Sequence, residues 1–158
     1  MQMTAPMEVG LTVTDLARMR TFYETALELQ FVSEVHVPGP KAVETAMCAE
    51  GYTAVRLQTQ TGERIKLLAP DVPPAPRTDT GGMILSHQSA TYLTFIVDDI
   101  AAVVERVREA GGMLLNAAPV TEVRPGVFLS FLRDPEGHIL EIVSYADVSA
   151  YRSDRVRK

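Results

Sequence analysis

At 158 residues, the chain is long enough for one domain with a substantial hydrophobic core. Apolar residues make up 46% of it and charged residues 22%, proportions that are ordinary for a soluble globular protein. The formal net charge of −5 at pH 7 argues against a nucleic-acid partner. One cysteine, Cys48, excludes an internal disulfide and any zinc cluster made of cysteines. Residues 1–6 do not resemble a signal peptide and no apolar run could span a membrane, so we expect a cytoplasmic protein without a membrane partner.

The chain begins with a predicted strand and helix. Residues 7–13 alternate between polar and apolar side chains, which predicts a strand. Thr14 or Asp15 is then expected to cap a helix that continues to about Leu29. The residues at helical spacing that predict its core-facing side are Leu16, Met19, Phe22, Tyr23, Ala26 and Leu27.

Three further strands are predicted after this helix, at residues 31–37, 52–59 and 64–68. The connection between the first two is polar and contains Pro-Gly-Pro at residues 38–40. The composition then changes, because four prolines are followed by a run rich in threonine and glycine. We therefore predict a linker or surface loop over residues 71–90.

A second block repeats this order. Residues 91–97 predict a strand, and Asp98 and Asp99 precede a helix that ends near Ala110. Two glycines, at positions 111 and 112, supply the stop signal. The strands predicted after the helix are residues 113–115, 126–132 and 139–144.

The two blocks match in kind, since each has a strand, an aspartate-capped helix and three more strands. Glu8 lies seven residues before Asp15, and Tyr92 lies seven residues before Asp99. Neither block could bury its sheet alone. The repetition of this small unit is the strongest evidence in the sequence for the architecture. We predict one α+β domain over residues 1–150, followed by a frayed or partner-packed C-terminal tail. Its parts are module one (7–70), the linker (71–90), module two (91–147) and the tail (148–158).

A tight turn and an interrupted strand stand near the end of module two. Asp134-Pro-Glu-Gly137 combines a turn-starting aspartate, a proline with a fixed φ and a glycine that can adopt positive φ. In the strand that follows, Glu141 interrupts an apolar run. Burying a charge is costly unless it is paired, so Glu141 marks a site or a rim. We expect His138, just after the turn, to be solvated.

Four segments together resemble the vicinal oxygen chelate superfamily: residues 13–23, 97–100, 110–112 and 134–141. That group contains glyoxalase I, methylmalonyl-CoA epimerase, extradiol dioxygenases, and fosfomycin- and bleomycin-resistance proteins. The similarity extends over residues 7–147. It implies a glyoxalase/bleomycin resistance/dioxygenase-like fold, in which two βαβββ modules form a cupped mixed sheet around a divalent metal. It also implies a homodimer.

The resemblance places the four metal-ligand positions on Glu8, Lys66, Tyr92 and Glu141. The usual ligands are His or Glu, Glu or Gln, His, and Glu, so two positions depart from the pattern. A protonated lysine has no lone pair, and its repulsion from a divalent cation at about 4 Å is roughly 8 kcal/mol at an effective dielectric constant near 20. We therefore expect no metal there. A shifted site for iron, manganese, zinc or nickel, using His36 or His87, stays open.

The same face of the predicted sheet carries the candidate binding residues. Strand alternation places Arg56, Arg64 and Lys66 together, with Glu8 and Glu141 as the opposite charges. The arginines suit a carboxylate or phosphate, so the expected ligand is a small anion. The alternatives are solvated arginines at the rim and a lysine–glutamate cluster with a purely structural role. The candidates for substrate binding are Arg56, Arg64, His36 as a possible general base, and Thr94.

Two functions compete. The first is a lyase or isomerase that uses Glu8 or Glu141 as acid and base, with Lys66 or Tyr92 stabilising an enolate-like oxyanion. The second is a metal-free protein that sequesters its ligand, as bleomycin-resistance proteins do. We favour the enzyme because charges in a cup are costly to keep without use. A metal-dependent glyoxalase or extradiol-type dioxygenase is a further alternative, which Lys66 disfavours.

Overall fold

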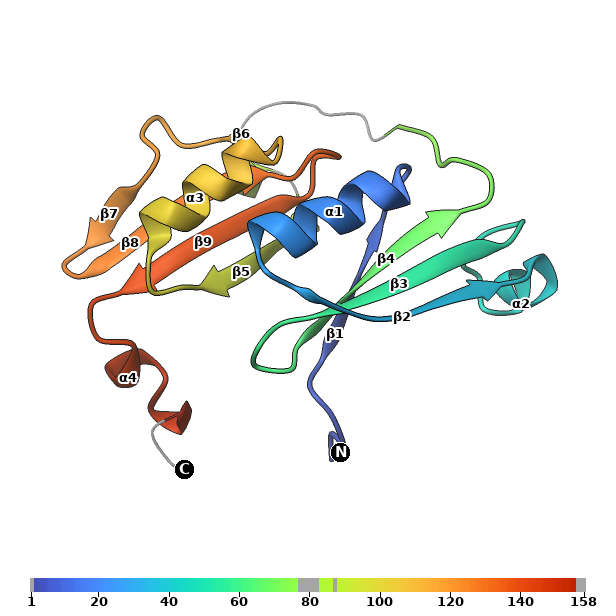
Figure 1. The fold of residues 1–158 in the computed structure, drawn as a ribbon, viewed down its shortest axis with the longest axis horizontal. Helices are drawn as coiled ribbons and strands as arrows, with labels where there is room; N and C mark the ends of the chain where they lie inside the picture. The colour runs from blue at the N-terminus through green and yellow to red at the C-terminus, as the bar shows by residue number, and fades with distance from the viewer. Residues whose placement is uncertain (1, 77–82, 87, 156–158) are drawn as a thin grey trace. The chain divides into compact units, whose positions relative to one another are not determined.

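The structure is a computed structural model that describes residues 2–76, 83–86 and 88–155. The chain divides into two compact units, residues 1–83 and 84–158, and each unit contains one mixed β-sheet with a long helix packed on it (Figure 1). The α+β class predicted from the sequence is therefore confirmed. Among the described residues, no helix has the length and apolar character needed to cross a membrane.

The first unit is a four-stranded sheet with two helices. Its elements are β1 (Glu8–Thr12), α1 (Leu16–Ala26), β2 (Gln30–Val37), α2 (Gly39–Glu44), β3 (Tyr52–Gln58) and β4 (Arg64–Pro70). The strand order is β1-β4-β3-β2. β1 and β4 are parallel, whereas β4 with β3 and β3 with β2 are antiparallel.

Helix α1 covers one face of this sheet, packing on β3 and β4. Its N-terminus is capped by Asp15, whose carboxylate accepts a hydrogen bond from the Arg18 amide at 3.0 Å. Glu28 has a φ of 56°, and this left-handed conformation ends the helix at Ala26, earlier than predicted. The buried side chains of the helix and of the two strands are Met19, Phe22, Tyr23 and Ala26, and Ala54, Val55, Leu57, Ile65 and Leu67.

The second unit contains the other sheet. Its elements are the 3₁₀ turn η1 (Ile84–Ser86), β5 (Tyr92–Ile96), α3 (Ile100–Glu109), β6 (Met113–Leu114), β7 (Thr121–Arg124), β8 (Val127–Arg133), β9 (Ile139–Tyr145), α4 (Val148–Tyr151) and the 3₁₀ turn η2 (Ser153–Arg155). The strand order is β5-β9-β8-β6, and β7 also pairs with β8. α3 packs on this sheet, and its N-terminus is capped by Asp99.

Both units have the same topology. In each, the first strand pairs in parallel with the last, and the remaining main pairings are antiparallel. The predicted repeat of two βαβββ modules is confirmed. The stop signal of the second helix is confirmed too, since Gly111 has a φ of 98° and the Gly112 amide donates to the Val107 carbonyl at 2.8 Å.

Two short elements differ from the prediction. Helix α2 lies in the connection that we expected to be irregular, because Pro40 stands in its first turn, where a proline is tolerated and its φ is already helical. Strand β7 was not predicted because all four of its residues are exposed and so show no alternation of burial. It turns into β8 at Gly126, which has a φ of 72°.

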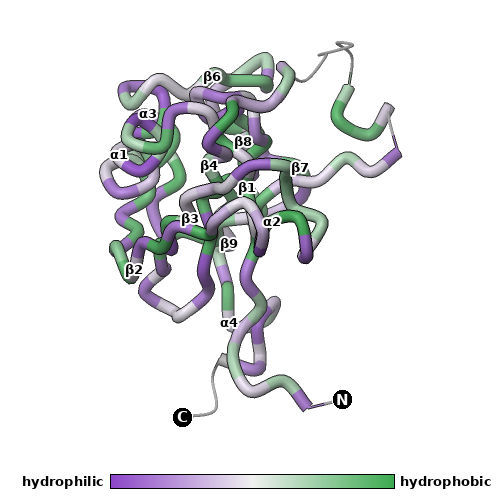
Figure 2. The backbone as a smooth tube through the Cα atoms, turned by 90° about the vertical axis from the view of Figure 1, so that its right-hand side faces the viewer, coloured by the Kyte–Doolittle hydropathy of each residue, from purple (hydrophilic) through white to green (hydrophobic). Residues whose placement is uncertain are grey.

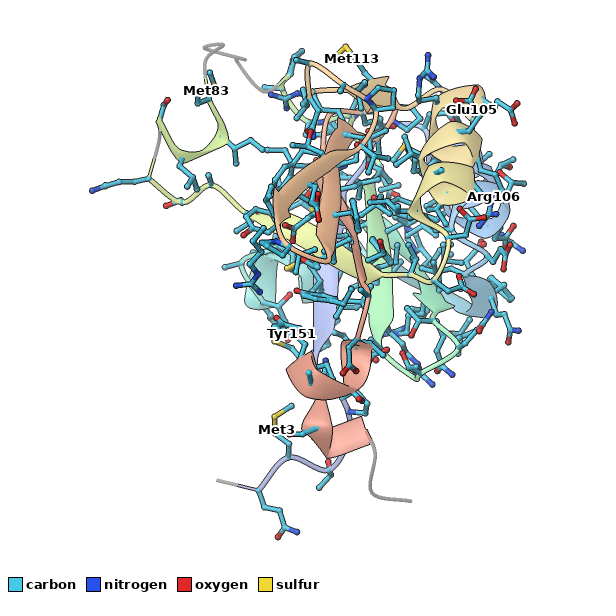
Figure 3. All side chains as sticks on the ribbon, turned by 90° about the vertical axis from the view of Figure 1, so that its left-hand side faces the viewer. Met3, Met83, Glu105, Arg106, Met113 and Tyr151 are labelled. Atoms are coloured by element: carbon cyan, nitrogen blue, oxygen red, sulfur yellow. The ribbon has the colours of Figure 1, made fainter. Side chains whose placement is uncertain are left out.

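The segment around η1 carries exposed apolar side chains. Met83 is 81% exposed and Leu85 is 83% exposed. Figure 2 shows this segment in green, and Met83 is labelled in Figure 3. At such exposure these two side chains contribute little to a hydrophobic core.

The turn between β8 and β9 is held by a buried carboxylate. Asp134 is 3% exposed and accepts hydrogen bonds from the amides of Glu136 and His138 at 3.0 and 2.9 Å. It also lies 2.8 Å from Nδ1 of His138. The expectation that His138 is solvated is therefore wrong, because its side chain is 24% exposed and is fixed by Asp134.

A buried hydroxyl in β8 gives a stability prediction. Within the described residues, Oγ of Ser130 is buried and has no hydrogen-bond partner. Because such a group has lost its water without compensation, Ser130→Ala should raise the free energy of unfolding by about 1 kcal/mol in urea denaturation. Ser144→Ala, at a half-buried position on β9, is the control and should change it by less than about 0.5 kcal/mol. A loss of stability in Ser130→Ala would mean that the hydroxyl has a partner, such as a buried water.

The C-terminal tail packs on its own unit. Asp147 caps α4, and the Tyr145 and Tyr151 rings stack with centroids 4.2 Å apart and an angle of 12° between their planes. Figure 3 labels Tyr151 on this helix. A frayed tail is thus wrong for residues 148–151, because the aromatic contact holds them against β9, whereas packing of the tail on a partner stays a prediction.

This contact predicts a loss of stability at alkaline pH. Burial, and next the interaction with Tyr151, raise the pKa of Tyr145 above its ordinary value of 10.0. Since the folded state holds the phenolic proton more tightly, the contribution to stability is present below pH 10.0 and is lost as the pH rises through the folded pKa. The free energy of unfolding in urea should therefore fall less above this pH in Tyr145→Phe than in the wild type. Equal losses in both proteins would contradict the assignment.

Candidate functional site

Strand pairing in the first unit gathers three cations around one carboxylate. Lys66 lies opposite Arg56 across β3 and β4, and Arg64 lies opposite Glu8 across β4 and β1. These positions alternate with the buried residues Val55, Leu57, Ile65 and Leu67, so their side chains lie on the face away from α1, as predicted. We call Arg56, Arg64 and Lys66 the basic cluster.

The contacts of Glu8 with the basic cluster are long. Its carboxylate oxygens lie 3.9 Å from Nε of Arg56, 3.6 Å from Nη1 of Arg64 and 3.8 Å from Nζ of Lys66. Charge-assisted hydrogen bonds are usually about 2.7–2.9 Å. All four side chains are between 30% and 36% exposed, so the cluster is half-buried. Glu8 therefore partners these cations without saturating their donors.

Gln58 is a member of this site that the sequence did not single out. Its side-chain oxygen accepts a hydrogen bond from Nε of Arg64 at 2.7 Å. Strand alternation placed Gln58 on the same face as Arg56, but an amide in a strand carries no signal of such a role. The contact orients the guanidinium of Arg64 and leaves its Nη groups for other acceptors.

In the second unit, pairing of β5 with β9 brings Thr94 opposite Glu141. The Thr94 hydroxyl donates a hydrogen bond to Oε2 of Glu141 at 2.6 Å. Both residues belong to the predicted site, and the structure brings them together. Tyr92 lies at the start of the same strand and is 43% exposed. Its ring makes an edge-to-face contact with Phe131, at a centroid separation of 5.3 Å and an angle of 87°.

His36 requires a correction. It lies opposite Thr53 in the β2–β3 pairing, whereas Ser33 lies opposite Arg56, so alternation places His36 on the other face from Arg56. A register shift between Phe31 and Ser33 sets this orientation. Nε2 of His36 lies 3.0 Å from the Asp71 carboxylate. The expectation that His36 reaches the face of the basic cluster is therefore wrong.

The four family ligand positions do not provide a donor set for a divalent metal. In the first unit the ammonium of Lys66 occupies one position and lies 3.8 Å from Glu8, which is also surrounded by two guanidinium groups. Three cations beside the one carboxylate repel a divalent ion. Among the described residues there is also no group of three or more His, Cys, Asp or Glu side chains that could hold a metal. His87, considered for a shifted site, lies outside the described residues.

Comparison with known proteins identifies the family. A model of the glyoxalase/bleomycin resistance protein/dioxygenase superfamily matches residues 6–142, and the chain belongs to this family, as its resemblance to the vicinal oxygen chelate proteins implied. No curated protein sequence matches the chain significantly.

Solved structures agree in fold. A glyoxalase family protein from Bacillus cereus has a TM-score of 0.77 and 20% identity, covering 92% of this chain and 97% of the other. A glyoxalase I mutant from Zea mays has a TM-score of 0.65 and 19% identity, covering 90% of this chain and 46% of that one. A glyoxylase/bleomycin resistance protein/dioxygenase domain from Frankia sp. EAN1pec has a TM-score of 0.64 and 18% identity, covering 92% and 95%. At these identities the likeness concerns the fold and not the reaction.

Proposed function

We propose that the protein is a lyase or isomerase of this family that acts on a small, anionic, oxygen-bearing molecule without a metal at the family position. The observation that carries the proposal is the basic cluster, in which a lysine stands at a ligand position beside two arginines. Three cations facing one carboxylate retain a surplus of positive charge. Arginine and lysine donors are suited to carboxylate and phosphate oxygens.

Glu141 is the proposed acid and base. Its hydrogen bond with Thr94 engages Oε2, so that Oε1 remains for proton transfer with a substrate carbon or hydroxyl. In the first unit, the basic cluster would bind an anionic group through charge-assisted hydrogen bonds. Tyr92, a partly exposed hydroxyl-bearing ring, would supply a further donor to an oxyanion.

A metal-free sequestering protein is the second candidate, and the exposure of Tyr92 against Phe131 favours it. An aromatic pair of this kind offers a surface on which a planar ligand can stack. The two candidates differ in outcome. An enzyme converts an excess of ligand into product, whereas a binder takes up a stoichiometric amount and releases it unchanged. The predicted homodimer and cytoplasmic location stay predictions.

The metal content of untagged protein tests the first part of the proposal. After exposure to iron, manganese, zinc or nickel and removal of loosely bound ions, elemental analysis should find far less than one metal per chain. The physical reason is that Lys66 adds a positive charge where the family supplies a lone pair. About one tightly held metal per chain would contradict the proposal and favour a glyoxalase or an extradiol-type dioxygenase.

A ligand screen tests the second part. Small carboxylates and phosphates are offered to the wild type and to Arg64→Gln, and binding is followed by calorimetry and product formation by NMR. We expect binding of at least one anion that weakens about tenfold in the variant, since one charge-assisted contact is lost. If no anion binds, the proposed function is wrong.

A further inference from the structure

We propose that the basic cluster binds a ligand group with two negative charges, such as a phosphonate, a phosphate monoester or a dicarboxylate. In the protein without ligand, the carboxylate of Glu8 occupies the position that this group takes. The inference rests on the proposed function and deepens it by naming the ligand class.

The first argument is charge. Within the described residues, each member of the basic cluster forms its ion pair with Glu8. Three cations and one carboxylate leave a net charge of +2, and each side chain is only about one third exposed. Partial burial strengthens electrostatic interactions compared with those in bulk water. A dianion neutralises this surplus, whereas a monoanion leaves a positive charge uncompensated.

The second argument is geometry. The two carboxylate oxygens of Glu8 face three cations, and none of the three nitrogen–oxygen distances is shorter than 3.6 Å. The side chain therefore lies among the donors without forming a close hydrogen bond to any of them. A phosphonate or phosphate group offers three oxygens, one for each member of the basic cluster, and a dicarboxylate offers four. Arg64, held by Gln58, presents its Nη groups for such a contact.

The third argument separates this inference from a purely structural role. If Glu8 only stabilised the fold, its replacement by glutamine would lower stability and leave the affinity for anions unchanged. If Glu8 holds the place of a ligand, glutamine removes a competing negative charge at the site, and dianions bind more tightly. The sign of the change in affinity therefore decides between the two roles.

The experiment is calorimetric titration of the full chain with methylphosphonate, malonate and acetate at mildly alkaline pH and low salt. The wild type is compared with Glu8→Gln, and Arg56→Gln is a second variant of the cluster. Glu24→Gln is the matched control, because it removes one carboxylate from α1, where Glu24 pairs with Arg20 at 2.9 Å. Thermal denaturation of each variant, with and without methylphosphonate, reports whether it is folded.

We expect methylphosphonate, malonate or both to bind the wild type at least about tenfold more tightly than acetate. Glu8→Gln should tighten dianion binding by about tenfold, Arg56→Gln should weaken it by about tenfold, and Glu24→Gln should leave it unchanged. The relative affinities of methylphosphonate and malonate identify the phosphonate or dicarboxylate source of the charge. If Glu8→Gln does not fold, the preference for dianions and its loss in Arg56→Gln still test the inference.

Three results would overturn it. Equal affinity for acetate and the dianions, or unchanged or weaker dianion binding in folded Glu8→Gln, would refute the ligand class and leave the proposed function standing. Absence of binding with all three probes in every protein would refute the proposed function and this inference together.

Discussion

Exchanging Glu141 for glutamine is expected to lower turnover by about 10²–10⁴-fold, the usual contribution of a positioned general acid or base. The change is nearly isosteric, and a glutamine oxygen can still accept the hydrogen bond that Thr94 donates at 2.6 Å. The variant should therefore fold and bind anions as the wild type does. The substitution removes the negative charge of the carboxylate and its ability to take up and return a proton.

Proton transfer can be measured before a full reaction is known. Small anionic carbonyl compounds are incubated with the protein in D₂O, and exchange of carbon-bound hydrogen is followed by NMR. Exchange catalysed by the wild type should disappear in Glu141→Gln and persist in Glu105→Gln. Glu105 is an exposed residue of α3, labelled in Figure 3, and it pairs with Arg108 at 2.8 Å. Exchange at the wild-type rate in Glu141→Gln would show that another group is the base. Stoichiometric binding without exchange would favour the sequestering protein.

Replacing Asp134 with alanine is expected to lower the free energy of unfolding by about 3 kcal/mol. The substitution leaves the amides of Glu136 and His138 without their acceptor and removes the partner of the His138 ring. Asp134 is also 3% exposed, so water cannot easily take over these hydrogen bonds. Urea denaturation gives the measurement.

Asp98→Ala is the control for this experiment. Asp98 is exposed, and its carboxylate accepts one hydrogen bond, from the Asp99 amide at 2.9 Å. Its loss should cost less than about 1 kcal/mol. If Asp134→Ala cost as little as the control, the turn would be held by its backbone alone. Asp134→Asn should lie between the two, since an amide oxygen can replace one carboxylate oxygen as an acceptor.

Much of the fold could be predicted because its signals are local and periodic. Alternation along β3 and β4 correctly assigned Val55 and Leu57 to the core face and Arg56 to the other face. The aspartate caps and the glycine stop correctly placed the two long helices. Helix α2 was missed because prolines were interpreted only as breakers, although one suits a first turn. An edge strand that is exposed on every side, such as β7, has no periodic signal to find.

The site was partly predictable for the same reason. Residues on adjacent strands share a face whenever their register agrees, and this brought Glu8 near Lys66 and Thr94 near Glu141. Register shifts cannot be seen in one sequence, which is why His36 was assigned to the wrong face. Contacts between neutral side chains, such as the ring of Tyr92 against Phe131, also depend on pairing over long sequence separations.

The shared strand order has a consequence for how the protein assembles. In each unit the last long strand, β4 or β9, lies between two strands that precede it in the sequence. The first strand, β1 or β5, is at the edge of the sheet and pairs only with this last strand. During synthesis β1 can pair only after β4 has been made, when nearly the whole module is complete. Pairing β1 with β4 closes a loop that contains the rest of the module, and the entropic cost of closing this loop makes the step slow. Glu8 meets Arg64 and Lys66 only in that closing step. The face that carries the basic cluster is thus among the last features of the module to form, and a chain that ends before β4 lacks Arg64 and Lys66.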